Sequence, residues 1–360
     1  MGANHYYYAN NETEKKPGYA RPLHSVLKCL KLLGYTFSKC RTEYNELVQA
    51  TPSYIAPPAF SFEDFAQTLK YLDVRRIPVT DENDDERPGT LAQRIIRHHE
   101  CTKTNFIKLS RWDCEFFENI NPYVILRLLA ENPQNHNLEV QWRFSDLIES
   151  GWVKSEELYE GLAASDRYLI VTEGSSDMEI LKKSLPLVAP DVADFFDFID
   201  MSNNYPFTGT GNVVRFTQGL VKINILNRVL IVLDNDTVGN AAFAALRNLK
   251  LPPNVKITVL PNISQCKKIL TLGPSGKRRE NINGRAVSIE WFLDLNFGAK
   301  TEPAVRWTVY DSNQDKYQGE LVGKDSYVRT FFKKVDREKK YNLSKLSQLW
   351  VHLLECCSSE

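Results

Sequence analysis

Two stretches of the sequence share one pattern: YLIVTEGSSDME at residues 168–179 and VLIVLDNDTVGN at residues 229–240. Each is a short aliphatic run that stops abruptly at carboxylate residues. Aliphatic runs without polar alternation indicate strands that are covered on both faces, as in a parallel sheet with helices on each side. The two stretches therefore predict strands of an α/β sheet that end in acidic side chains.

Further strands and helices are expected to alternate with these two strands. The apolar runs FFDFID and VKITVL predict strands at 195–200 and 255–260. Helical stretches follow three of the strands, at 177–188, 212–223 and 237–249. Strand–helix units of this length form a doubly wound sheet through right-handed crossovers.

The whole chain divides into four predicted regions. The Rossmann-like parallel sheet is assigned to residues 166–284. A mainly helical region at 21–160 precedes it, and a mixed α+β region at 285–360 follows it. The polar residues 1–20 are expected to be flexible.

Composition restricts the possible functions. The chain has 45 Lys and Arg residues and 45 Asp and Glu residues, so any contact with nucleic acid must come from a local basic patch. The seven cysteines contain no CxxC pair and are expected to be reduced thiols. The chain begins without an apolar signal segment and has no 18-residue apolar run, which predicts a cytoplasmic protein without membrane contact.

Acidic residues stand where the first and third predicted strands end. Glu173 ends the first strand, and Asp234 and Asp236 end the third. The carboxyl ends of parallel strands line one edge of an open sheet, where ligands bind. If the two strands are neighbours, their carboxylates converge and need a cation, because like charges repel and burial penalises each of them. Hard carboxylate oxygens favour Mg²⁺ or Mn²⁺.

The first turn of the following helix adds another acid. Asp177 either holds the metal or complements the helix dipole, and the sequence favours neither role. Gly174 is expected to allow a sharp turn, and Ser175 or Ser176 to cap the helix. Asp200 closes the second strand at the same edge and is a further candidate ligand.

A basic segment, CKKILTLGPSGKRRENINGR, follows the fourth strand. It is expected to be a flexible loop beside the acidic strand ends, able to bind phosphates without reading bases. A solvated surface loop is the alternative. Its six cations are Lys267, Lys268, Lys277, Arg278, Arg279 and Arg285.

These motifs resemble a known family. TEGSSDMEIL followed by LDNDTVG is similar to the Toprim domain of topoisomerases, primases and OLD-type nucleases, and looks closest to the OLD-like nucleases. The resemblance extends to the bacterial HEPN/Toprim-associated proteins. It rests on LKLLGYTFSKC, FIDMSNNYPFTGTGN, TLGPSGKR, NGRAVSIEWFLDL and YQGEL with the following Lys324.

The resemblance implies a Toprim fold and metal-dependent cleavage of phosphodiesters, often in bacterial defence against phages or plasmids. Glu173 would be the general base or a metal ligand, and Asp234 and Asp236 the principal ligands. In OLD-like members a basic residue after the fourth strand assists the transition state; Lys277 is the chosen candidate here, with the other five cations of the basic segment as alternatives. Nucleic acid is then the expected partner, with a second copy of the chain or a regulatory protein as further candidates.

Two other functions stay open. LDNDTV also fits the D-x-D-x-V motif of haloacid dehalogenase-type phosphatases, with Asp234 as nucleophile and Asp236 as acid, although no downstream Asp pair follows. A non-catalytic binding module is the other reading.

Arg94 and His99 have the R-x4-H spacing of RNA-cleaving helical domains. An Arg and a His on a helix surface with no catalytic role are the alternative. Glu290, on a predicted helix at 288–295, could be a further acid of the site, but a role in solvent or at the helix dipole is favoured.

Overall fold

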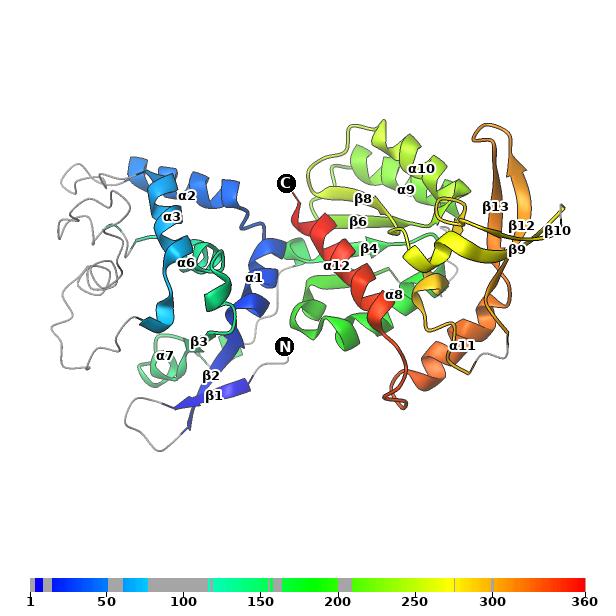
Figure 1. Cartoon of the computed structure of the whole chain (residues 1–360). Coiled ribbons are helices and arrows are strands. Elements are labelled where there is room, and N and C mark those ends of the chain that lie inside the picture. The colour runs from blue at the N-terminus through cyan, green and yellow to red at the C-terminus, as the bar shows by residue number, and fades with distance from the viewer. Residues whose placement is uncertain are drawn as a thin grey trace. The chain divides into compact units, whose positions relative to one another are not determined.

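The computed structural model shows two compact units, Gly2–Glu160 and Gly161–Ser359 (Figure 1). Each unit is described by itself below. The structure describes residues 4–8, 15–50, 61–76, 116, 119–154, 156–157, 164–199, 209–274, 276–298 and 301–359.

The N-terminal unit combines helices with a small antiparallel sheet. Its strands are paired in the order β1-β2-β3. Strands β1 and β2 lie largely within the residues that the composition predicts to be flexible. The strands are β1 (Asn4–Tyr8), β2 (Lys15–Pro22) and β3 (Glu139–Arg143). The helices are α1 (Leu23–Leu32), α2 (Phe37–Ala50), α3 (Phe62–Tyr71), α6 (Pro122–Leu129) and α7 (Ser145–Glu149), with 3-10 turns η1 (Val74–Arg76) and η3 (Pro133–Asn135).

Aromatic side chains form the core of this unit. Tyr44 stacks on Phe65 and meets Phe62 and Phe116 edge-on. A capping box fixes the start of α3, because the Ser61 hydroxyl accepts from the backbone N–H of Asp64 while the Asp64 carboxylate accepts from the backbone N–H of Ser61.

The second unit contains the predicted parallel sheet, which confirms the α/β class. Its strands are β4 (Tyr168–Val171), β5 (Phe196–Phe198), β6 (Arg228–Leu233) and β8 (Val255–Val259). All pairs are parallel and the order is β5-β4-β6-β8. The order in which the strands are added reverses at β4: the chain passes from β4 outward to β5 and then returns to add β6 on the other side of β4. Open α/β sheets bind ligands at this position.

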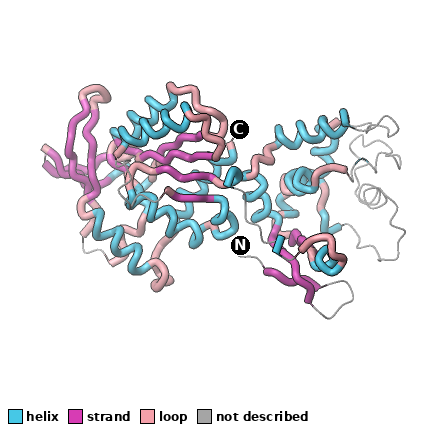
Figure 2. Tube along the Cα trace, turned by 180° about the vertical axis from the view of Figure 1, so that it is seen from behind, coloured by secondary structure: helices cyan, strands magenta, loops and turns pink. Residues whose placement is uncertain are grey.

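Helices cover both faces of this sheet (Figures 1 and 2). Helices α9 (Thr210–Lys222) and α10 (Thr237–Arg247) bury Val213 and Leu246 against Val229 and Ile231. Helices α8 (Ser175–Val188) and α12 (Ser344–Ser358) pack on the other face, where the Trp350 indole donates to the Ser184 hydroxyl. Two 3-10 turns precede strands of this sheet, η5 (Ala164–Asp166) before β4 and η6 (Pro190–Phe195) before β5.

A second sheet follows in the order β10-β9-β12-β13. Its strands are β9 (Ile269–Gly273), β10 (Gly276–Glu280), β12 (Ala304–Asp311) and β13 (Lys316–Leu321). The short strand β7 (Asn235–Asp236) pairs with β11 (Ala286–Val287). The remaining elements are η7 (Ser264–Lys268), η8 (Ile289–Phe292) and α11 (Lys324–Lys334).

Two predictions about this region are wrong. The basic segment is a β-hairpin, not a flexible loop, because Thr271 is buried and β9 is paired on both sides. The predicted helix at 288–295 is only the turn η8, since its residues are buried all round and Leu293 is already extended. Helix α11 was not predicted from the sequence.

Other expectations are confirmed within the described residues. The five described cysteines are unpaired thiols: Cys29, Cys40, Cys266, Cys356 and Cys357. In the same part of the chain, no helix is long and apolar enough to cross a membrane.

Gly239 allows α10 to start directly against the end of β6. A Cβ atom at this position would lie 2.1 Å from the carbonyl oxygen of Asp234, which is far inside van der Waals contact. Because the obstacle is backbone, it cannot rotate away. Any larger residue would push α10 away from the acidic strand end.

We expect Gly239→Ala to lower the free energy of unfolding by about 1–3 kcal/mol through overpacking. Urea denaturation measures this change. Gly219→Ala is the matched control, because Gly219 lies within α9 and a Cβ there meets nothing within 4 Å. Equal stability of the Gly239 and Gly219 variants would contradict the close approach.

Candidate metal-binding site

The ends of β4 and β6 are joined by a direct contact between two predicted site residues. The two strands are neighbours in the sheet, with Val171 opposite Ile231. Just beyond them, the Glu173 carboxylate accepts a hydrogen bond of 2.9 Å from the backbone N–H of Asp234. The two strands are therefore neighbours, which is the condition that the prediction of a metal site requires.

The start of α9 is tied to the same carboxylate. The Thr210 hydroxyl donates to the other Glu173 carboxylate oxygen, and the backbone N–H of Gly209 donates to the Glu173 carbonyl oxygen at 3.1 Å. Both oxygens of the carboxylate are thus held. The orientation of Glu173 is fixed by β6 and α9 together.

Asp236 caps α10. One carboxylate oxygen accepts from the backbone N–H of Gly239 at 2.7 Å, and the other accepts from the side-chain amide of Gln318 on β13. The Gln318 amide oxygen in turn accepts from the N–H groups of Thr237 and Val238 at 2.9 and 3.2 Å. Gln318 therefore locks β13 onto the first turn of α10.

Asp177 lies in the first turn of α8 and accepts from the backbone N–H of Gly174 at 3.1 Å. The predicted cap was wrong, since Gly174 is the N-cap residue and neither Ser175 nor Ser176 takes that position. The chain does bend at Glu173 and Gly174, as predicted, but the bend does not require the conformational freedom of glycine. The Gly174 backbone is extended, with φ −137° and ψ 159°, which any residue adopts.

Glu290 is the acid that the sequence prediction assigned wrongly. It is 4% exposed, accepts from the Ser288 hydroxyl at 2.5 Å, and acts electrostatically on Asp177 and Asp234. The sequence could have indicated this burial, because Glu290 lies inside the apolar run IEWFL. When such a run is buried on all sides, the acid within it is buried too. We call the five acids Glu173, Asp177, Asp234, Asp236 and Glu290 the acidic cluster.

Burial and mutual repulsion raise the pKa values in the acidic cluster. Burial, followed by the charges of Glu290 and Glu173, raises the pKa of Asp177 to about 8. Burial and then Asp177 raise the pKa of Asp234 well above its ordinary value. Burial also raises the pKa values of Glu173 and Asp236. The folded chain therefore concentrates negative charge that only a cation or protons can neutralise.

Lys324 is the cation that acts on this cluster. Its ammonium lies 3.5 Å from the Glu320 carboxylate, at the start of α11. Partial burial works to lower the pKa of Lys324, but the charges of Glu290 and Glu320 outweigh it and raise that pKa. Lys324 also lowers the pKa of Asp177, whereas Lys277 is not among the groups that shift it.

Two of the six predicted cations have charged or aromatic partners among the described residues. Arg279 forms a salt bridge of 2.7 Å with Glu302. Arg285 lies 4.1 Å over the ring of Trp307 and 3.4 Å from the Glu280 carboxylate, so it stabilises the second sheet. The remaining four are exposed on η7 and β10: Lys267, Lys268, Lys277 and Arg278.

The chemistry of the acidic cluster fits Mg²⁺ or Mn²⁺, which prefer carboxylate oxygens. Asp234 is the best-placed ligand, because nothing among the described residues donates a hydrogen bond to its carboxylate. Within this part of the chain, no three Asp, Glu, His or Cys side chains form a preassembled metal-binding group. Mutual repulsion and the hydrogen bonds that hold Glu173 and Asp236 explain why the acids approach each other without closing into a cage.

Residues 2–166 match the family model of HEPN/Toprim N-terminal domain 1. This match supports the HEPN/Toprim-associated family and covers the N-terminal unit up to the start of β4. Neither the curated proteins nor the solved structures gave a match to the chain. The acidic cluster lies beyond the matched residues, so the OLD-like character of its motifs stays a prediction.

Three residues singled out from the sequence lie outside the described residues. They are Arg94 and His99 of the R-x4-H spacing and Asp200 at the end of the second strand.

We expect Asp177→Asn to stabilise the metal-free protein at pH 8. The pKa of Asp177 is raised on folding, so the folded state holds a proton that the unfolded chain releases, and stability falls as pH rises from about 4 to 8. The amide removes this loss and should add about 1 kcal/mol or more at pH 8 while changing little at pH 4.

Urea denaturation in EDTA between pH 4 and 8 measures the difference. Glu179→Gln is the control, because Glu179 is an exposed acid on the same helix. Parallel pH profiles of the free energy of unfolding for wild type and Asp177→Asn would show that ionisation of Asp177 does not destabilise the folded state.

Proposed function

We propose that this protein is a metal-dependent nuclease of the Toprim type that serves in bacterial defence against phages or plasmids. The contact between Glu173 and the backbone of Asp234, at the reversal point of the sheet, carries this proposal. It places acids from two strand ends in one partly buried site. The HEPN/Toprim match of the N-terminal unit supports a nuclease-associated defence module.

Asp234 and Asp236 would be the principal ligands of Mg²⁺ or Mn²⁺, with Asp177 and Glu173 completing the set. The ion, when bound, would polarise the scissile phosphate and lower the pKa of an attacking water. Asp236 is held by the α10 cap and by Gln318, so it offers a fixed direction. The Asp234 carboxylate, to which no described residue donates a hydrogen bond, would adjust to the ion.

Glu173 is proposed as general base. Burial raises its pKa, and a carboxylate with a raised pKa is a stronger base near neutral pH. Its hydrogen bonds to Thr210 and to the backbone of Asp234 hold the carboxylate in one orientation. Glu173 could therefore accept the proton of the attacking water without first reorienting.

Two lysines compete for the role of the basic residue that assists the transition state. The family resemblance assigns that role to the segment that contains Lys277. Charge interactions within the site favour Lys324, whose ammonium acts on Glu290 and Asp177. Lys277, exposed on β10, suits contact with a more distant phosphate of the substrate.

The exposed cations of η7 and β10 are proposed to bind the nucleic-acid backbone. They lie on elements that follow β8 directly, and an edge strand presents its side chains without covering neighbours. Phosphate contacts of this kind position DNA or RNA without reading its sequence. A second copy of the chain or a regulatory protein would complete the proposed defence system.

The phosphatase alternative fits the structure less well. It requires Asp236 to act as a free acid next to a nucleophilic Asp234. Both carboxylate oxygens of Asp236 instead accept hydrogen bonds, from Gly239 and Gln318. Unlike Glu173, Asp236 is the N-cap residue of α10, so its carboxylate could not turn toward a substrate without uncapping that helix.

We expect Glu173→Gln and Asp234→Asn each to reduce Mg²⁺- or Mn²⁺-dependent cleavage of plasmid DNA or RNA by about 100-fold or more, because each removes a base or a ligand. Circular dichroism should show an unchanged fold.

Lys324→Met should reduce cleavage more than Lys277→Met does. Undiminished cleavage by Glu173→Gln would refute the proposed site, and hydrolysis of p-nitrophenyl phosphate that depends on Asp234 but not on Glu173 would establish the phosphatase instead.

The basic residues should appear in the salt dependence of binding. In an Asp234→Asn background, we expect the combined change of Lys267, Lys268 and Lys277 to Ala to weaken binding of a fluorescent oligonucleotide. The slope of log affinity against log salt should become less steep by about 0.7–0.9 for each phosphate that the variant no longer neutralises. Changing Lys222, Lys250 and Lys339, which are exposed elsewhere, to Ala is the matched control. An unchanged slope in the first variant would place the nucleic acid elsewhere.

A further inference from the structure

Helix α12 carries a thiol and an imidazole one turn apart on the side that faces β8. The Cys356 sulfur lies 3.7 Å from Nε2 of His352, four residues earlier, and 3.4 Å from the Thr258 hydroxyl oxygen on β8. Thr258 is buried, whereas Cys356 and His352 are each partly exposed. We call these three side chains the thiol cluster. None of them belongs to the acidic cluster.

The contacts of His352 direct an N–H group at the sulfur. Its Nε2 atom lies 3.2 Å from the Val259 carbonyl oxygen and 2.9 Å from the Thr258 hydroxyl oxygen. Because a carbonyl oxygen only accepts, Nε2 carries a hydrogen in this arrangement. The Cys356 sulfur therefore faces a donor, and a thiolate beside a protonated imidazole is the pairing that activates a cysteine.

The electrostatic environment favours the charged form of both groups. The hydrogen bond with Cys356 raises the pKa of His352, although partial burial opposes this change. Partial burial works to raise the pKa of Cys356, but the hydrogen bonds with His352 and Thr258 outweigh it and lower that pKa. The other charged groups around the end of α12 are Glu355 on the helix itself, Lys256 on β8 and Arg228 on β6.

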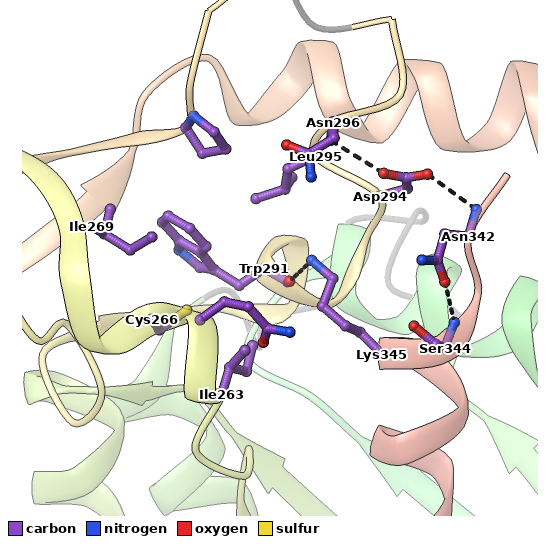
Figure 3. A pocket seen from close by; sticks show the side chains of 12 residues that line it. Ile263, Cys266, Ile269, Trp291, Asp294, Leu295, Asn296, Asn342, Ser344 and Lys345 are labelled. Carbon is purple, nitrogen blue, oxygen red and sulfur yellow. Dashed lines mark hydrogen bonds between the residues drawn. The ribbon is translucent and has the colours of Figure 1, made fainter.

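Helix α12 is anchored at both ends, so the thiol cluster is held against β8. At the start of the helix, the Lys345 ammonium donates to the Trp291 carbonyl oxygen at 2.5 Å, in the wall of a cavity of about 250 Å³ (Figure 3). At its end, the Tyr168 hydroxyl and the Lys256 ammonium donate to the Cys357 carbonyl oxygen at 2.7 and 3.0 Å. Lys256 thus places a positive charge where the helix dipole alone would disfavour a thiolate.

We propose that Cys356 is a nucleophilic thiol that peroxides oxidise. The thiolate would attack one oxygen of hydrogen peroxide, so that an S–O bond forms as the O–O bond breaks. The departing hydroxide would take the proton from Nε2 of the His352 imidazolium and leave as water. Cys356 is thereby oxidised to a sulfenic acid, and the peroxide is reduced. Because His352 and Thr258 enclose part of the sulfur, a small oxidant suits it better than a bulky disulfide.

The reaction rate of each cysteine with iodoacetamide between pH 5 and 9, measured by mass spectrometry of peptides from the folded chain, tests this proposal. The rate at Cys356 should rise with a midpoint below the ~8.5 of an ordinary thiol. At pH 7, Cys356 should react about tenfold faster than Cys29, which is also partly exposed, since each unit of pKa changes the thiolate fraction about tenfold. Cys40 and Cys266 should react more slowly still, because burial raises their pKa values to about 11 and about 12.

His352→Gln removes the imidazolium and keeps a side chain that can form hydrogen bonds. We expect this variant to slow the reaction of Cys356 at pH 7 by about tenfold and to move its midpoint toward ~8.5, with the rate at Cys29 unchanged. His24→Gln, which changes a histidine of the N-terminal unit, is the matched control and should leave Cys356 as reactive as in wild type. Circular dichroism checks that both variants fold.

A second measurement uses the proposed oxidant itself. After treatment with hydrogen peroxide, dimedone should label Cys356 in wild type and in His24→Gln, and should label no such site in Cys356→Ser. The proposal is overturned if Cys356 reacts no faster than Cys29 at pH 7, if its midpoint lies at or above ~8.5, if a folded His352→Gln reacts as wild type does, or if dimedone does not label Cys356. These measurements need neither metal nor nucleic acid, so their outcome is independent of the proposed nuclease activity.

Discussion

The repulsion among carboxylates that two neighbouring strands bring to one edge is the constraint on which this unit depends. The hydrogen bond from the Asp234 backbone to Glu173 holds the two strand ends together, so the acids cannot separate. The elements around them supply the compensation. Helices α8, α9 and α10 all begin beside these acids, and the positive ends of their dipoles offset part of the negative charge.

The second sheet contributes to the site through single side chains. Gln318 of β13 satisfies Asp236 and two N–H groups at the start of α10, so it links the sheets by hydrogen bonds. Gly319, the next residue, has no room for a side chain, because a Cβ would lie 2.6 Å from Val305 and 2.7 Å from Trp307. The stretch YQGEL therefore combines a polar contact to the site with close packing behind it.

What could be predicted from the sequence was local in origin. Strand β6 and the acids Asp234 and Asp236 follow from an apolar run that stops at carboxylates. Glu290 and Lys324 could not be placed in this way, because they reach the cluster only through the tertiary packing of η8 and α11. The β9–β10 hairpin was missed for another reason. Strand β10 lies at the edge of its sheet, and its successive charged side chains are exposed to solvent. Its sequence therefore lacks the alternation of apolar and polar residues that indicates a strand.

The turn η8 has a different environment on each side. Glu290 acts on Asp177 and Asp234, while the carbonyl oxygen of the next residue, Trp291, accepts a hydrogen bond from the Lys345 ammonium. Both side chains are buried, so neither can move without displacing the same short piece of backbone. The charge of the acidic cluster and the contact with Lys345 therefore meet in one short turn, Ile289–Phe292.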